Sequence, residues 1–74
     1  MKKYNLAFLG SGAMGTEVID YVISNLKDKF NIALIMDNEI NNAEKLSSKY
    51  NISPVITNDI NILLEMKDID LIIE

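Results

Sequence analysis

The stretch LGSGAMG at residues 9–15 holds all three glycines of the 74-residue chain within six positions. It follows YNLAFL at residues 4–9, a short and mostly apolar run that predicts a strand buried on both faces. Beyond the glycines, apolar residues recur near helical spacing from residue 14 to residue 26, which predicts an amphipathic helix. Glycine weakens a regular element that it interrupts, so its concentration between strand and helix indicates a role for the turn itself.

The rest of the chain continues the alternation of strands and helices. Strands are predicted at residues 32–36, 54–57 and 69–73, and helices at residues 41–50 and 62–64, the last with Asn61 as its cap. Such alternation implies parallel strands and right-handed crossovers. We therefore expect an α/β fold, a Rossmann-type parallel sheet with helices on both faces and the strand order 3-2-1-4, truncated after the fourth strand.

Composition excludes several classes of function. The chain contains no cysteine, histidine, tryptophan or arginine, which removes disulfides, thiolate chemistry, imidazole bases and the usual metal ligands. Its net charge of −4 argues against a broad nucleic-acid contact. The apolar run after the N-terminal MKK is too short for a secretory signal, and no run is long enough to span a membrane. We therefore expect a cytoplasmic protein.

The spacing G-x-G-x-x-G between a strand and a helix is typical of dinucleotide-binding domains. Gly10 permits the tight turn, Gly12 lets backbone amides approach a pyrophosphate, and Gly15 allows close packing of the helix on the strand. The helix N-terminus can hold the anion without any basic side chain. The predicted pyrophosphate-binding residues are Gly10, Ser11, Gly12, Ala13, Met14 and Gly15.

An acid follows the second strand, where a dinucleotide-binding domain recognises the adenosine ribose. Asp37 lies 22 residues after Gly15, and we expect it to accept hydrogen bonds from the ribose hydroxyls, with Asn38 beside it. A carboxylate there opposes the 2′-phosphate of NADP, so we expect NAD, with NADP as the alternative cofactor. The competing interpretation is that Asp37 only caps the second helix.

Methionine and tyrosine at helix and strand positions are interpreted as packing residues. Met14 and Met36 are expected to fill the core, and Tyr21 and Tyr50 to pack on or cover the sheet. None of their side chains is a candidate ligand contact; Met14 enters the predicted site through its backbone.

Residues 4–74 resemble the N-terminal nucleotide-binding half of a group of dehydrogenases. The turn from Gly12 to Gly15 and the ending DLIIE at residues 70–74 are similar to those of the L-aspartate dehydrogenase family. Homoserine dehydrogenases also often end this strand in glutamate, as Glu74 does here, whereas the glucose-fructose oxidoreductase and inositol dehydrogenase family usually ends it in a small residue. Position 38, commonly arginine in such relatives, is asparagine here, which argues against tolerance of NADP.

The resemblance implies hydride transfer between NAD and L-aspartate or iminoaspartate. It also implies that residues 1–74 are the N-terminal part of the dinucleotide-binding domain, and that a missing C-terminal domain carries the catalytic histidine and binds the amino-acid-type substrate. We expect no catalytic residue in this chain. The open edge of the fourth strand is expected to be covered by missing chain or by another copy, which favours a homo-oligomer.

Two other classes of function use the same features. The nucleotide-sensing domain of potassium uptake systems has the same turn and acid, but it usually carries a glycine-aspartate pair after the third strand, where this chain has ITND at residues 56–59. A purely structural α/β module would need all three glycines as turn residues only.

Overall fold

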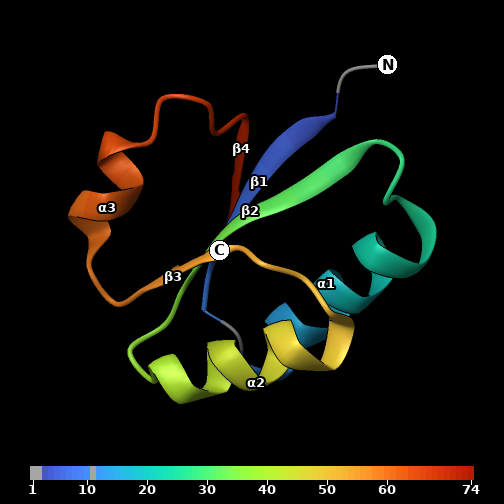
Figure 1. Ribbon diagram of the computed structural model, residues 1–74, viewed down its shortest axis with the longest axis horizontal. Coiled ribbons are helices and arrows are strands. Elements are labelled where there is room, and N and C mark those ends of the chain that lie inside the picture. Colours follow the sequence, from blue (N-terminus) through green and yellow to red (C-terminus); the bar gives the residue numbers. More distant parts are fainter. Residues whose placement is uncertain (1–2, 11) are drawn as a thin grey trace.

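The protein forms a four-stranded parallel sheet flanked by three helices (Figure 1). The computed structural model describes residues 3–10 and 12–74, with the backbone alone for residues 13 and 14. In chain order the elements are β1 (Tyr4–Leu9), α1 (Ala13–Asn25), β2 (Phe30–Met36), α2 (Ile40–Tyr50), β3 (Val55–Thr57), α3 (Ile60–Glu65) and β4 (Leu71–Ile73). The sheet order is β3-β2-β1-β4, which confirms the predicted α/β class and the order 3-2-1-4.

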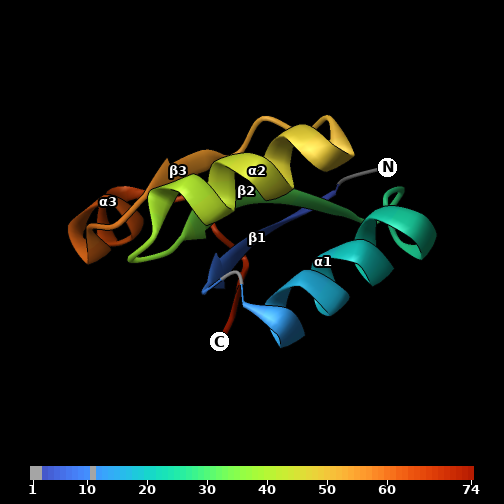
Figure 2. The ribbon, with the colours of Figure 1, turned by 90° about the horizontal axis from the view of Figure 1, so that it is seen from below.

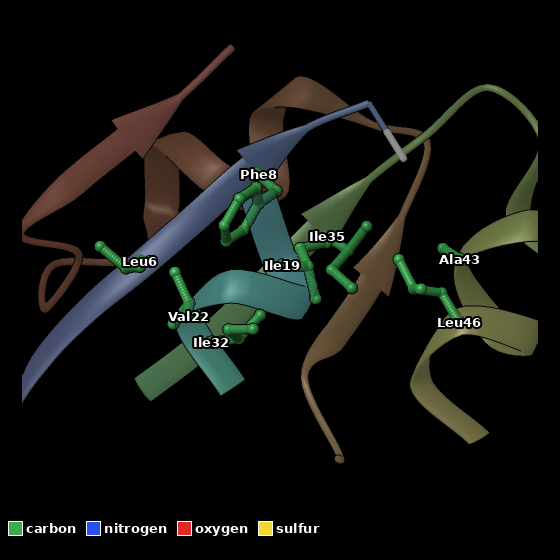
Figure 3. Packing of buried hydrophobic residues seen from close by; sticks show 8 residues of the cluster. All are labelled: Leu6, Phe8, Ile19, Val22, Ile32, Ile35, Ala43 and Leu46. Atoms are coloured by element: carbon green, nitrogen blue, oxygen red, sulfur yellow. The ribbon is translucent and has the colours of Figure 1, made fainter. Parts of the chain in front are cut away.

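Helices cover both faces of the sheet, as the pattern of buried residues requires. One core cluster joins β1 and β2 to α1 and α2 through residues such as Phe8, Ile19 and Leu46 (Figure 3). A smaller cluster on the other face joins Ala7 and Leu34 to Leu63 of α3. Helices α1 and α2 therefore lie on the same face of the sheet, and Figure 2 shows them as two separate helices beside the strands. The central strand β1 is thus buried on both faces, as its continuous apolar sequence predicts.

A shift of register interrupts the pairing of β1 with β2. Leu6 pairs with Ile32 but Ala7 pairs with Leu34, so Ala33 has no opposite residue on β1. Side chains of a strand alternate between the two faces of the sheet, and the extra residue shifts this alternation in β2 by one position. Ile32 and Ile35 therefore lie in the same core cluster although they are three residues apart. The periodicity of IALIM gives no indication of this irregularity.

Three elements, α3, β2 and β4, begin two residues away from their predicted starts. Helix α3 begins at Ile60 and is capped by Asp59, not Asn61, because the Asp59 carboxylate accepts a hydrogen bond from the backbone N–H of Asn61 at 2.9 Å. Strand β2 begins at Phe30, two residues earlier than expected, because Phe30 and Asn31 pair with Tyr4 and Asn5.

Strand β4 is shorter than predicted because its backbone pairing with β1 is incomplete at Asp70. The Asp70 N–H donates to the Asn5 carbonyl at 2.9 Å. The Asn5 backbone N–H donates to the Asp70 carboxylate at 2.7 Å instead of to a carbonyl, so the strand begins only at Leu71. Leu71 and Ile72 are each 51% exposed. Within the described residues β4 pairs with β1 alone, and the expectation that its outer edge is covered stays a prediction.

The tyrosine prediction holds for one residue and is wrong for the other. Tyr50 packs against the larger core cluster, whereas Tyr21 is 59% exposed on the solvent side of α1. The buried face of this helix contains Ile19 and Val22, and Tyr21 lies on the exposed face. In residues 3–10 and 12–74, no helix is long and apolar enough to cross a membrane.

Candidate functional site: the glycine turn

The turn between β1 and α1 has the backbone shape that its first glycine was expected to provide. Gly10 has a φ of +99°, a conformation that L side chains rarely adopt. Its backbone N–H donates to the Met36 carbonyl at 2.6 Å, which ties the turn to the carboxyl end of β2. Gly10 therefore redirects the chain out of the sheet and holds the turn beside the next strand.

The third glycine lets α1 lie directly against this turn. A Cβ added to Gly15 would lie 2.7 Å from the Gly10 carbonyl oxygen and 3.4 Å from its carbon. Both atoms are backbone, so no flexible side chain could move aside. Gly15 thus performs the close packing of helix on strand that its spacing predicts.

No contact or backbone strain within the fold requires a glycine at position 12. A Cβ added to Gly12 would meet no atom within 4 Å, and its φ of −69° is open to any residue. Gly12 is the N-cap of α1, and without a side chain it cannot cap the helix amides. The Thr16 N–H makes the first intrahelical bond, to the Gly12 carbonyl at 2.8 Å. By helix geometry, the N–H groups of residues 13 to 15 therefore have no intrahelical acceptor.

A hollow of about 240 Å³ lies beside the turn, at the carboxyl ends of β1 and β4. All three glycines line it, together with Leu9, Val18 and Glu74. No acidic residue lies in the first turn of α1, so the positive end of the helix dipole is not offset there. Glu74 supplies the only carboxylate among the residues that line this hollow.

Asp37 lies next to the turn but outside the hollow. It directly follows Met36, whose carbonyl accepts from Gly10, and its own N–H donates to the Thr57 carbonyl of β3 at 3.0 Å. Its Oδ1 accepts from the Glu39 N–H at 2.9 Å, which shapes the chain before α2. Asp37 is not the N-cap of α2, a position that Glu39 occupies. The half-buried carboxylate is therefore held at the end of β2 by the backbone on both sides.

The structure brings part of the predicted site together. Gly10, Gly12 and Gly15 surround one hollow, and Asp37 is tied to their turn through Met36. Asn38 is exposed in the bend after Asp37. Ser11 lies outside the described residues, and for Ala13 and Met14 only the backbone, which begins α1, is described.

Val18 and Glu74 are two of the hollow's lining residues that were not predicted as site residues. Val18 belongs to the apolar pattern of residues 14–26, but it is 37% exposed and lines the hollow. Glu74 directly follows β4. Because the carboxyl ends of parallel strands meet at one edge of a sheet, its position after the fourth strand was the available signal. Neither would be found from the glycine motif alone.

The described residues contain no group of three or more histidine, cysteine, aspartate or glutamate side chains placed to hold a metal ion. A larger hollow, of about 630 Å³, lies at the opposite end of the sheet and shares no residue with the glycine turn.

No protein-family model matches the chain, and no curated protein matches it either.

Proposed function

We propose that the chain binds NAD at the glycine turn and acts as the cofactor-binding part of an oxidoreductase. The observation that carries the proposal is the contrast between Gly12 and the other two glycines. The fold itself accounts for Gly10 by its positive φ and for Gly15 by its 2.7 Å approach to the turn. Gly12 has open space around it, so a glycine there is explained by what approaches from outside.

The turn suits the pyrophosphate of a dinucleotide. The first amides of α1 lack intrahelical acceptors, and their dipole end favours an anion. Glycine at position 12 exposes these amides without a Cβ in the way, beside a hollow of about 240 Å³. That volume is below the range of roughly 300–1,000 Å³ for complete ligand pockets. It fits the phosphates and an adjoining sugar, with the remainder of the cofactor lying across the sheet edge.

In this proposal Asp37 recognises the adenosine ribose. The carboxylate follows β2, and the Gly10–Met36 hydrogen bond keeps this strand end next to the turn. A carboxylate has about four acceptor positions, so the bond from Glu39 does not prevent it from accepting from a sugar hydroxyl. The same charge repels a 2′-phosphate, and neighbouring Asn38 supplies no cation. NAD is therefore the proposed cofactor, with NADP as the weaker one.

The proposed reaction class rests on the resemblance to the L-aspartate dehydrogenases. In this proposal the protein moves hydride between NAD and L-aspartate or iminoaspartate, and a separate substrate domain supplies the catalytic groups. Bound NAD would accept or deliver the hydride. The role of residues 3–74 is to hold and orient it, through the amides of the turn and the carboxylate of Asp37. A homoserine dehydrogenase or a sugar oxidoreductase would use the same cofactor site.

The test of cofactor choice compares two variants that each remove one carboxylate. Asp37→Asn changes the proposed ribose acceptor, and Asp28→Asn changes an exposed acid in the turn before β2, at the other end of the sheet. Calorimetry with NADH and NADPH should show tighter NADH binding by the unsubstituted protein. Asp37→Asn should weaken NADH binding about tenfold, the effect of losing a charge-assisted hydrogen bond of about 1.5 kcal/mol.

The control variant, Asp28→Asn, should bind NADH and NADPH with the affinities of the unsubstituted protein. Equal affinity for NADH and NADPH, or equal losses in both variants, would contradict the role of Asp37. If the protein with its proposed substrate domain binds NADH but transfers no hydride, the result would instead support a nucleotide sensor.

A further inference from the structure

The larger hollow lies at the amino ends of the strands, away from the glycine turn. It has a volume of about 630 Å³, within the range of roughly 300–1,000 Å³ typical of small-molecule sites. Its walls are the C-terminal parts of α1 and α2, the segment between α2 and β3, and the first residues of β1 and β2. Both helices lie on the same face of the sheet, where they contribute to one core cluster.

Apolar side chains form the inner part of this hollow. Val22 and Ile23 of α1, Ile32 of β2 and Ile52 after α2 all line it. Ala33, the extra residue at the register shift between β1 and β2, lies in the same lining. Such irregularities are common next to functional sites, where they re-aim side chains. The apolar surface suits the hydrocarbon body of a ligand.

The charged side chains in the lining of the hollow carry a net positive charge, unlike the chain as a whole. Lys3 and Lys27 line it against the single carboxylate of Asp68, in a chain with a net charge of −4. An anionic head group is therefore attracted to the larger hollow.

Hydrogen bonds fix the polar parts of these walls. The Tyr50 hydroxyl donates to Asp20 Oδ1 at 2.7 Å, which links the end of α2 to α1. The Asn31 amide donates to Asn5 Oδ1 at 3.1 Å, and the Asn5 amide donates to the Asp68 carbonyl at 3.0 Å. The hollow is thus bounded by segments that are tied together, not by a loose gap between helices.

We propose that this hollow binds a small amphipathic anion, a molecule with a hydrocarbon body and one carboxylate or similar head group. The body lies on Ile23, Ile32 and Ile52, and the head group lies at Lys3 and Lys27. This site is separate from the proposed NAD site and does not depend on it, because the two hollows have no residue in common.

The test uses octanoate as the probe, with methyl NMR of the isoleucine-labelled protein as the readout. The methyl signals of Ile23, Ile32 and Ile52 should shift at millimolar octanoate, while those of Ile62 and Ile72, on α3 and β4, should not. Octanol, which has the same chain without the charge, should bind more weakly.

Variants locate the head group and the body. Lys27→Gln should weaken octanoate binding about threefold to tenfold, the range expected for one partly exposed ion pair. Lys45→Gln, on α2 and outside the hollow, is the matched control and should have no effect. Ser53→Trp places a large ring at an exposed position in the lining and should abolish binding.

Three results would overturn the proposal. Octanol binding as tightly as octanoate would remove the role of the lysines. Shifts confined to Ile62 and Ile72, or no shift at all, would remove the site. Undiminished octanoate binding by Ser53→Trp, with the variant shown to be folded by circular dichroism, would place the ligand elsewhere.

Discussion

Alanine substitutions at Gly12 and Gly15 should separate ligand binding from stability within one motif. At Gly15 the new Cβ would lie 2.7 Å from the Gly10 carbonyl oxygen, and ordinary contact begins at 3.4 Å. Helix α1 or the turn must then move by about 0.7 Å, the difference between those two distances. Such overpacking costs about 1–3 kcal/mol, and replacing glycine by alanine within a helix regains about 1 kcal/mol. We therefore expect Gly15→Ala to lower the free energy of unfolding by about 1 kcal/mol, with an upper value of about 2 kcal/mol.

Gly12→Ala should leave the folded structure almost unchanged. Its Cβ would enter open space at a backbone conformation that alanine accepts. The gain of about 0.4–1 kcal/mol from a less flexible unfolded chain is offset by the loss of glycine at the N-cap. NADH affinity should nevertheless fall at least tenfold, because the Cβ would stand where the pyrophosphate approaches the amides.

Thermal and urea unfolding, followed by far-ultraviolet circular dichroism, measures the first effect, and calorimetry with NADH measures the second. For a domain of this size, 1 kcal/mol corresponds to a shift in Tm of about 4–8 °C. The Tm of Gly15→Ala should therefore lie several degrees below that of the unsubstituted protein. The Tm of Gly12→Ala should equal that of the unsubstituted protein. Equal destabilisation by the two substitutions would refute this reasoning, as would unchanged NADH affinity in Gly12→Ala.

Further substitutions test the core, the turn and a hydroxyl contact. Leu34→Ala removes a fully buried side chain from the cluster between the sheet and α3 and should cost about 2–5 kcal/mol in urea unfolding. Gly10→Ala forces a side chain into a positive φ and should cost about 1–2 kcal/mol, measured by thermal melts. The hydrogen bond to Asp20 and the charge of Asp20 raise the pKa of Tyr50 above 10.0, so its contribution to stability is present below that pH and is lost as the pH rises further. Unfolding midpoints above pH 10 should fall more steeply for the unsubstituted protein than for Tyr50→Phe, and identical pH profiles would contradict this link.

The sheet order could be predicted because local patterns carry most of that information. Short apolar runs alternating with helical periodicity require parallel strands, and the crossover rule then leaves few arrangements. The roles of Gly10 and Gly15 also follow from spacing, because a turn and a close helix contact depend on residues near in sequence. Both are confirmed by the geometry of the turn.

Features that depend on pairing between distant segments could not be predicted in this way. The extra residue Ala33 is set by how β2 aligns with β1, and the late start of β4 by the bond from the Asn5 backbone to Asp70. Asp59 replaces Asn61 as the cap of α3 because either residue type can cap a helix and only the path of the chain decides.

In the candidate site, too, local features could be predicted from the sequence, and contacts between distant segments could not. The glycine turn was located from sequence, whereas Glu74 joins its hollow only because β4 lies beside β1. Asp37 was predicted as a ribose acceptor from its distance along the chain, and the hydrogen bonds that hold its backbone become visible only in the fold.

Amide NMR of the protein during titration with NADH shows whether the nucleotide binds at the glycine turn. We expect the largest shifts at the backbone amides of Gly10, Gly12 and Gly15 and of Asp37, with little change at Asn31 and Ile52 near the opposite end of the sheet. Shifts centred on that opposite end, or no shift of the glycine amides at millimolar NADH, would contradict it.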